Sequence, residues 1–353
     1  MLRDKMTSVE RTTALFRGEE LDRVPVVPFM TAHYAVVNGI PIADVFSNAE
    51  KSFAAQTRGR ELYCMDGHNM YGYAMYGGWE FGGEIVWPGK DGQAPLVKKY
   101  PVKNEEEAMK LELPDDILNA GSVPIGLEFA RIAARQGTAV PVMANGGLSM
   151  ASCTVGIENL MMWLITSPEV VHHVVRKCTD FTLYLINYWA QEFGAENMIA
   201  FMGTATESNG LISPQHFEEF ALPYIKEIAE KLTEIGVNKC LMHICADQKR
   251  NLPGYSTINW PKRTIFSTGT EITIKETADA FPGHIVGGQV DTLLLNRGKP
   301  EKVLESCRQL IEEVNNLQLQ GSFALMPACD VPAYSPPVNV YQMAKAAREY
   351  GQY

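Results

Sequence analysis

The stretch MIAFMGTATESNGLISPQHFEEFALPYIKEIAEKLTEIGVNKCLMHIC, residues 198–245, contains one complete strand–helix–strand unit. Met198 to Gly203 is an apolar run of strand length. Ser213-Pro214 then predicts a helix start, because serine caps helices and proline fits their first turn. The apolar face of that helix repeats until Gly236, and Val237 to His243 predicts the next strand. We expect the two strands to be parallel, with the helix outside the sheet.

The same alternation continues along the chain in both directions. Further strands are expected at residues 24–30, 62–68, 139–145, 264–267, 285–290 and 323–328, which makes eight in all. Further helices are expected at 123–136 and 167–194, and from Ile274, Pro300 and Val338 onward. Eight parallel strands that alternate with helices predict an α/β fold, the (β/α)8 TIM barrel. An open doubly wound sheet is the alternative, but no Gly-x-Gly-x-x-Gly fingerprint follows the first strand.

Residues 65–102 interrupt the alternation with an irregular segment rich in glycine and aromatic residues. Gly-Lys-Asp-Gly at 89–92 predicts a hairpin turn within it. We expect an insertion over one face of the barrel, whose aromatic residues from Tyr71 to Trp87 either wall a pocket or pack within the insertion. Because the sequence has no internal repeat, low-complexity tract or Ser/Gly linker, residues 1–353 are expected to form a single domain.

Composition and charge restrict the partners of the chain. Its 353 residues are 46% hydrophobic and 20% charged, and 31 Lys+Arg against 41 Asp+Glu give a net charge of −10. No basic cluster is present that would bind the phosphates of a nucleic acid. The charged N-terminus does not resemble a signal peptide, and no apolar run reaches the roughly 18 residues of a membrane span. Seven scattered cysteines predict reduced thiols, and together these features indicate a cytoplasmic protein.

Three residues at strand ends form a candidate metal site. In a barrel of this kind the chemistry lies where the carboxyl ends of the strands run into loops. His243 and Cys245 are two residues apart and therefore point to the same side of their strand, while Cys329 follows the last strand. One imidazole and two thiolates suit Zn²⁺, and three protein ligands leave a position open for a substrate. The alternative is that these cysteines are inert core residues, as we expect for Cys64, Cys153, Cys178, Cys240 and Cys307.

Other strand ends supply candidate catalytic and substrate-binding residues. Glu207, after the fourth strand, is a candidate partner of a ligand, general base or transient fourth zinc ligand, although a helix cap fits equally well. The candidate substrate contacts are His33, Tyr34, Asn145, Gln289 and Asp291.

The order of several motifs resembles the uroporphyrinogen decarboxylase superfamily over nearly the whole chain. These motifs are Leu-Asp-Arg-Val-Pro-Val at 21–26, Leu-Ile-Ser-Pro at 211–214, Phe-Glu-Glu-Phe at 217–220, Leu-Pro-Tyr at 222–224 and Cys-Asp-Val-Pro at 329–332. The decarboxylases of that superfamily hold substrate carboxylates with an Arg-x-x-Gly-Arg loop after the first strand. Here residues 31–36 contain no arginine, which disfavours a metal-independent decarboxylase of a uroporphyrinogen-type substrate.

The His-x-Cys pair with a distant cysteine resembles the zinc-dependent corrinoid methyltransferase branch of that superfamily. The resemblance implies that His243, Cys245 and Cys329 bind zinc and that a separate small corrinoid-binding protein presents cobalamin. The small molecule would be a thiol acceptor such as coenzyme M, or a methyl donor such as a methoxylated aromatic in an O-demethylation. The chain departs from the branch at Ala246-Asp247, where Gly-Asn or Gly-Asp is commoner. A non-catalytic accessory barrel remains the other alternative.

Overall fold

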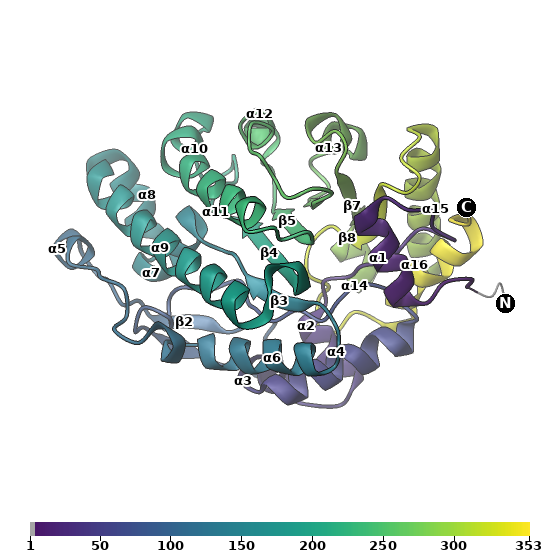
Figure 1. Ribbon diagram of the computed structural model, residues 1–353, viewed down its shortest axis with the longest axis horizontal. Coiled ribbons are helices and arrows are strands. Elements are labelled where there is room, and N and C mark those ends of the chain that lie inside the picture. The colour runs from purple at the N-terminus through teal and green to yellow at the C-terminus, as the bar shows by residue number, and fades with distance from the viewer. Residues whose placement is uncertain (1–3) are drawn as a thin grey trace.

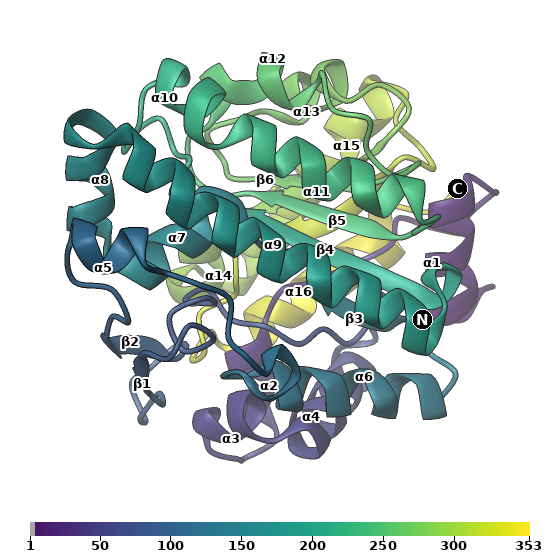
Figure 2. The same ribbon diagram turned by 60° about the vertical axis from the view of Figure 1, so that its left-hand side comes forward.

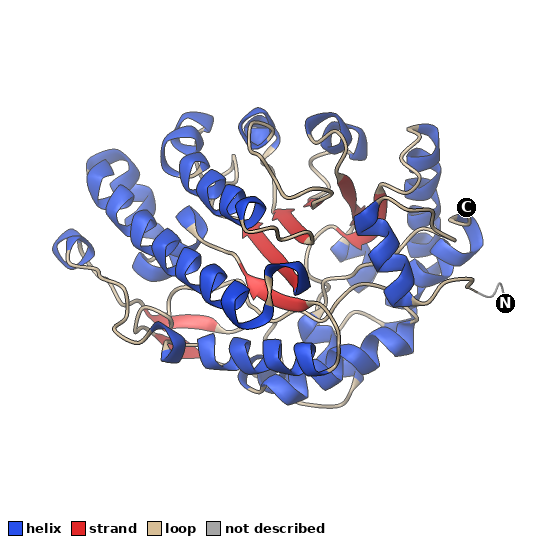
Figure 3. Ribbon diagram, viewed as in Figure 1, coloured by secondary structure: helices blue, strands red, loops and turns tan. Residues whose placement is uncertain are grey.

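A computed structural model describes residues 4–353 as an α/β fold around a parallel sheet (Figure 1). The sheet has the order β3-β4-β5-β6-β7-β8, and every neighbouring pair in it is parallel. Its strands are β3 (Val140–Met143), β4 (Met198–Thr204), β5 (Cys240–Ile244), β6 (Ile265–Thr268), β7 (Ile285–Val290) and β8 (Phe323–Pro327). The strands lie at the centre and the helices around them, as expected for parallel strands joined by helical crossovers (Figure 3).

Helices connect the strands and cover the outer face of the sheet. They are α1 (Ser8–Arg17), α2 (Thr31–Val37), α3 (Ile42–Ser47), α4 (Ala49–Tyr63), α5 (Glu105–Met109), α6 (Val123–Arg135), α7 (Gly147–Val155), α8 (Ile157–Thr166), α9 (Pro168–Phe193), α10 (Pro214–Phe220), α11 (Leu222–Glu234), α12 (Leu252–Tyr255), α13 (Ile274–Ala280), α14 (Thr292–Arg297), α15 (Pro300–Asn316) and α16 (Pro337–Tyr350). Short 3₁₀ turns occupy Ile117–Asn119, Ala195–Asn197 and Lys249–Asn251. The longest helix, α9, packs along β3 and β4 (Figure 2).

The single helix expected between Ser213 and Gly236 is two helices in the structure. It breaks at Ala221, whose backbone leaves the ideal helical conformation at φ −118° and ψ −54°. Pro223 accounts for the break, because proline has no N–H to donate and its ring collides with the preceding turn of a helix. The same proline is tolerated in the first turn of α11.

The first expected strand, residues 24–30, is an isolated parallel bridge between Val26 and Leu325 of β8. The N–H of Val27 donates to the carbonyl of Leu325 at 3.0 Å. Pro25 and Pro28 lack the N–H groups that a longer ladder would need, so the pairing stays short.

The second expected strand, residues 62–68, is also not a regular strand. The segment starts in the last turn of α4, which ends at Tyr63, and Cys64 then takes a left-handed conformation. The N–H of Asp66 donates to the carbonyl of Val26 at 2.8 Å, which places this segment next to the first one. The fold class is confirmed, but an isolated bridge takes the first strand position and a single backbone hydrogen bond marks the second.

A buried cluster inside the sheet fills the end from which the strands start. Its members come from five strands, from the N-terminal helix and from the segment after it: Ile199, Leu241, Ile265, Ile285, Ala324 and Met326, with Ala14, Leu15, Phe16 and Leu21. Helix α1 begins with a capping box of Thr7 and Glu10 and ends at Gly18, whose φ of 70° suits glycine. Because α1 closes the amino ends of the strands, the carboxyl ends are left for a site.

The insertion contains the expected hairpin. Strands β1 (Glu84–Val86) and β2 (Leu96–Lys99) pair antiparallel, and the N–H of Gly92 donates to the carbonyl of Gly89 in the turn between them. Among residues 4–353 no single helix is long and apolar enough to cross a membrane, and only α7 and α8, bent by 113° relative to each other, reach that length and composition together.

Candidate metal centre

Strand β5 directs His243 into the interior of the sheet. Leu241, two residues earlier, belongs to the inner cluster, so His243 points to the same side. Ser267 of β6 pairs in register with His243, and its hydroxyl contacts His243 Nδ1 at 3.2 Å. This contact fixes the ring, because the orientation of a metal-binding histidine is set by the partner of its other nitrogen. His243 Nε2 is buried and has no hydrogen-bond partner among the described residues.

Two thiols lie next to this unpartnered nitrogen. Cys245 directly follows β5 and Cys329 follows β8, and their Sγ atoms are 3.9 Å apart. The ligand atoms of His243, Cys245 and Cys329 all lie within 4.8 Å of one another. Tetrahedral zinc, with bonds of about 2.0–2.3 Å to nitrogen and sulfur, separates its ligand atoms by roughly 3.5–3.8 Å. The three residues therefore fit a zinc ion after small side-chain movements.

The two cysteines also have opposite shifts in pKa. A hydrogen bond from Cys245 and the neighbouring His243 lower the pKa of Cys329, whereas the contact with Cys329 and burial raise the pKa of Cys245. The thiolate is the form of cysteine that binds metals. The pair is thus prepared to offer one thiolate even before a cation is present.

An apolar pocket of about 320 Å³ opens above these three residues. Its walls are Phe29, Thr31, Phe46, Met70, Tyr71, Gly72, Tyr73, Ala74, Tyr76, Gln93, Ala94, Met143, Asn145, Ser149, Met150, Phe201, Gly203, Thr204, Ala205, His243, Cys245, Cys329 and Asp330. Both interpretations of the aromatic insertion hold for different residues: Tyr71, Tyr73 and Tyr76 wall the pocket, while Trp79 and Trp87 pack edge to face on each other. The size and lining are typical of a small-molecule site.

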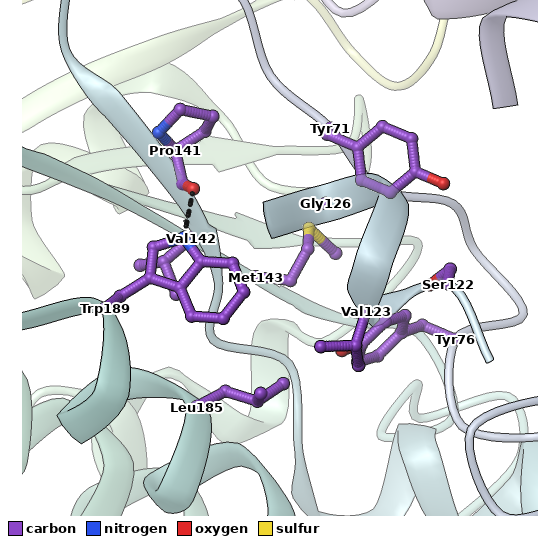
Figure 4. A pocket seen from close by; sticks show the side chains of 10 residues that line it. All are labelled: Tyr71, Tyr76, Ser122, Val123, Gly126, Pro141, Val142, Met143, Leu185 and Trp189. Atoms are coloured by element: carbon purple, nitrogen blue, oxygen red, sulfur yellow. Dashed lines mark hydrogen bonds between the residues drawn. The ribbon is translucent and has the colours of Figure 1, made fainter. Parts of the chain in front are cut away.

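A second, much smaller cavity of about 20 Å³ lies behind the aromatic wall (Figure 4). It shares Tyr71, Tyr76 and Met143 with the main pocket and is closed by α6, β3 and α9. Trp189 of α9 donates from Nε1 to the carbonyl of Pro141 on its far side. The cavity has room for about one water molecule, so the wall of the main pocket is backed by packed protein.

Asn145, a predicted substrate contact, does line the pocket. Its Oδ1 accepts a hydrogen bond from the N–H of Gly203 at 2.7 Å, which fixes the orientation of the amide. The Nδ2 group has no hydrogen-bond partner among the described residues. Asn145 therefore offers a free amide NH₂ group, with two N–H donors, to a ligand.

His33 and Tyr34 lie away from the pocket. They belong to α2, and both nitrogens of the buried His33 ring are used, by the carbonyl of Ala333 at 2.9 Å and by the hydroxyl of Tyr63 at 2.7 Å. The ring of Tyr34 packs so closely on Gly59 that even a Cβ atom there would lie 2.1 Å from it. This placement does not support the expectation that these two residues contact a substrate.

The side chains of Gln289 and Asp291 also form hydrogen bonds within the protein and lie outside the pocket. The amide of Gln289 donates to the hydroxyl of Thr268 at 2.7 Å and to carbonyls of the following loop. Asp291 is exposed and caps α14, accepting from the N–H of Leu293 at 2.6 Å. Neither residue lines the pocket.

Glu207 lies one layer behind the pocket wall. Its carboxylate accepts hydrogen bonds from the N–H and the hydroxyl of Ser149, and Ser149 itself faces the pocket. Burial raises the pKa of Glu207 to about 7, against the opposing effect of these hydrogen bonds. Glu207 is not part of the His–Cys–Cys cluster.

The pocket includes residues that were not among the predicted site residues. Asp330 lines it and accepts a hydrogen bond from Gln93 of the insertion at 2.8 Å. Its position directly after Cys329 was a usable signal, but nothing in the sequence links Gln93 to a residue 237 positions away. Ala246, where the chain departs from the resemblance, has φ 59°, a conformation that favours glycine.

The remaining cysteines are not near the cluster. Cys153, Cys178, Cys240 and Cys307 are buried, as expected for core residues, and burial raises the pKa of each to about 12. Cys64 differs from this expectation, because it is exposed at the end of α4.

Comparisons with known proteins agree on the family. The sequence profile described as "Uroporphyrinogen decarboxylase (URO-D)" matches residues 7–350. The methylcobamide:CoM methyltransferase MtbA of Methanosarcina acetivorans is 26% identical, over 98% of both chains. The methylated-thiol–coenzyme M methyltransferase of Methanosarcina mazei is 25% identical over 67% of this chain and 61% of that protein.

A solved structure has the same fold. A methyltransferase from Methanosarcina mazei superposes with a TM-score of 0.81 and 22% identity, and the match covers 98% of this chain and 99% of the other.

Proposed function

The chain belongs to the uroporphyrinogen decarboxylase (URO-D) family, and within that family we propose that it is a zinc-dependent methyltransferase. It moves a methyl group between the corrinoid of a small partner protein and a small molecule bound in the pocket. The observation that carries the proposal is the His243–Cys245–Cys329 cluster, with its unpartnered nitrogen, at the base of an apolar pocket. The names of relatives such as MtbA support the same reaction class.

Each residue of the site has a separate role in this proposal. His243, Cys245 and Cys329 would hold the zinc ion, and Ser267 keeps the histidine ring in place. When bound, zinc supplies Lewis-acid chemistry and favours the thiolate form of a thiol substrate. Asn145 offers a hydrogen bond to the small molecule, and Glu207 positions Ser149 in the pocket wall. The small molecule is a thiol acceptor such as coenzyme M or a methyl donor such as a methoxylated aromatic.

The pocket argues against the two alternatives. A uroporphyrinogen-type substrate carries many carboxylates, but no lysine or arginine lines the pocket among the described residues. An accessory barrel has no need for a histidine and two cysteines whose ligand atoms converge within 4.8 Å, with a buried histidine nitrogen left without a partner. We also infer that residues 1–353 form one domain, supported by the family match over 7–350.

Elemental analysis tests the proposal. Protein purified without chelators should contain about one zinc per chain, and Cys245→Ser should lose most of it. Methyl transfer, followed as the change in corrin absorbance with free cobalamin, should fall by more than about 100-fold in this variant. Its melting temperature should change little, because the packed core holds the site.

Cys64→Ser is the matched control, since Cys64 is exposed and lies outside the cluster. It should keep both the zinc and the activity. A wild-type protein that is fully active without metal would contradict the proposal.

A further inference from the structure

We propose that the small molecule in this pocket is uncharged and largely apolar, with the chemistry of a methyl aryl ether, and that the site disfavours anionic thiols such as coenzyme M. This inference rests on the proposed function and names its substrate class. It follows from three features of the pocket: its charges, the hydrogen-bonding state of a nearby backbone amide, and the shape of its apolar walls.

The pocket supplies no positive side chain for an anion. None of its described lining residues is lysine or arginine, and one of them, Asp330, is an acid. A zinc ion would bring two positive charges, but the thiolates of Cys245 and Cys329 would balance them. A sulfonate of coenzyme M would therefore be buried without a cation, which is costly in free energy.

A backbone amide of a kind that often holds anions is already occupied here. The amide groups at a helix N-terminus bind phosphate, sulfate or carboxylate groups. At the start of α7, the N–H of Ser149 donates to the carboxylate of Glu207 at 3.1 Å. The carboxylate of Glu207 therefore occupies this amide, so an anionic ligand does not find the N–H of Ser149 free.

The walls match a flat apolar molecule with one hydrogen-bond acceptor. Phe29 stands edge to face against Phe201 and against His243, with ring centres 5.5 and 5.4 Å apart. Tyr71, Tyr73 and Tyr76 of the insertion form the other wall. Aromatic rings favour such edge-to-face or offset contacts with another ring.

One polar contact completes this fit. Asn145 Nδ2 is free, whereas Asn145 Oδ1 is held by Gly203. An oxygen of an aryl ether or phenol can accept from this donor without bringing charge into the pocket.

The corresponding reaction balances with a reduced corrinoid as the second reactant. The bond between the methyl carbon and the ether oxygen breaks, and a bond forms between that carbon and Co(I). The electron pair of Co(I) becomes the new bond, so the cobalt is formally Co(III) afterwards. The oxygen keeps the pair of the broken bond and takes a proton from water, which yields a phenol.

Calorimetric titration of the zinc-loaded wild type tests the charge preference. The probes are two matched pairs that differ in charge: 3-methoxybenzamide against 3-methoxybenzoate, and 2-mercaptoethanol against 2-mercaptoethanesulfonate. In each pair the neutral member should bind at least about tenfold more tightly, and the methoxybenzamide should bind most tightly of all. Equal or tighter binding of the anionic members, or no binding of any probe, would overturn the inference.

Ala74→Lys provides a second, independent arm. Ala74 is exposed and lines the pocket, so a lysine there adds a cation with little risk to the fold. It should reduce the preference for the neutral methoxybenzamide over methoxybenzoate by about tenfold. Ala54→Lys is the control, because Ala54 is exposed on α4 outside the pocket, and it should leave the preference unchanged. An unchanged preference in Ala74→Lys would contradict the inference.

Methyl transfer, measured separately, distinguishes the two proposals. Zinc-dependent transfer to 2-mercaptoethanesulfonate at a lower KM than any neutral probe would refute the substrate class and leave the methyltransferase standing. Neutral-selective binding without any corrin-dependent transfer, even with corrinoid proteins of the same genome, would support the substrate class and refute the proposed function.

Discussion

Glu207 is a buried carboxyl whose protonation links the pocket wall to stability. Burial raises its pKa to about 7 from an ordinary value near 4.5. A raised pKa means that the folded protein holds this proton more firmly than the unfolded chain does. The stability that it contributes is therefore complete below about pH 4.5 and is lost as the pH rises through about 7.

Replacing this carboxyl with an amide removes that pH dependence. From pH 5 to pH 8 the free energy of unfolding of the wild type should fall. The fall in Glu207→Gln should be smaller by on the order of 2 kcal/mol. Chemical denaturation at both pH values measures the difference. Glu20→Gln, at an exposed position, should follow the wild type. Identical pH profiles for Glu207→Gln and the wild type would show that Glu207 is ionised in the fold.

At this scale the structure brings some of the predicted site residues together and places others away from the pocket. His243, Cys245 and Cys329 could be found because the two-residue period of a strand and the convergence of strand ends place them together. His33 could not be judged, since the residues after the first strand turn at once into α2 and direct its ring toward Tyr63. Such placement depends on hydrogen bonds between segments far apart in the chain.

At the scale of elements, one buried carboxylate attaches the insertion to the barrel. Glu80 accepts hydrogen bonds from the hydroxyl of Tyr73 at 2.8 Å, from the N–H of Gly77 at 2.7 Å and from the hydroxyl of Ser122 at 2.6 Å. Ser122 directly precedes α6, and Tyr73 lines the pocket. Glu80 thereby holds the aromatic wall against the body of the protein.

We expect Glu80→Gln to loosen that wall. An amide nitrogen cannot accept, so the variant should lose about 1–3 kcal/mol of stability. Because the wall positions the small molecule, KM should rise several-fold while the zinc content stays unchanged. Glu84→Gln on β1 is the control, since its contacts with Lys98 and Lys99 are exposed and contribute little. Unchanged KM in Glu80→Gln would show that the pocket does not depend on this anchor.

The elements themselves were predictable wherever local patterns decide them. The alternation of apolar strands with capped amphipathic helices predicted β3 to β8, and Gly89 to Gly92 predicted the hairpin. The first two strands were not predictable in detail, because a segment with Pro25 and Pro28 reads as apolar and buried but cannot form a full ladder. Tertiary contacts with Leu325 keep it in place instead.

For the whole molecule, stability and chemistry lie at opposite ends of the strands. The carboxyl ends hold the candidate metal ligands, whereas a buried ion-pair network lies near α1. Arg11 contacts Asp22 and Asp66 at 2.6 Å each, and Arg23 contacts Asp66 at 2.8 Å. The network continues through Asp4 to Arg348 of α16, so it joins the two ends of the chain. Such a division is typical of barrels, where one end carries the site and the other the stability.

This network makes the protein sensitive to acid. Burial alone would raise the pKa of Asp22, but hydrogen bonds from Arg11 and from the N–H groups of Met6 and Lys5 lower it far below its ordinary value. A lowered pKa contributes stability that is present above about pH 3.8 and is lost as the pH falls toward the folded-state pKa. The side chain of Asp22 is only 4% exposed, so solvent screens the pair with Arg11 little.

Asp22→Asn should therefore lower the free energy of unfolding by about 3–5 kcal/mol at pH 7, because it leaves Arg11 buried with one charge fewer around it. Below about pH 3.8 the difference from the wild type should shrink, because the wild type then begins to lose the stability that the ionised Asp22 contributes. Denaturant titrations at pH 7 and pH 3 measure both values. Glu227→Gln, which removes an exposed partner of Arg176, should cost no more than about 1 kcal/mol.

Zinc content should be the same in all three proteins, since the network lies at the end of the strands away from His243. Loss of zinc in Asp22→Asn would mean that the two ends of the barrel are coupled.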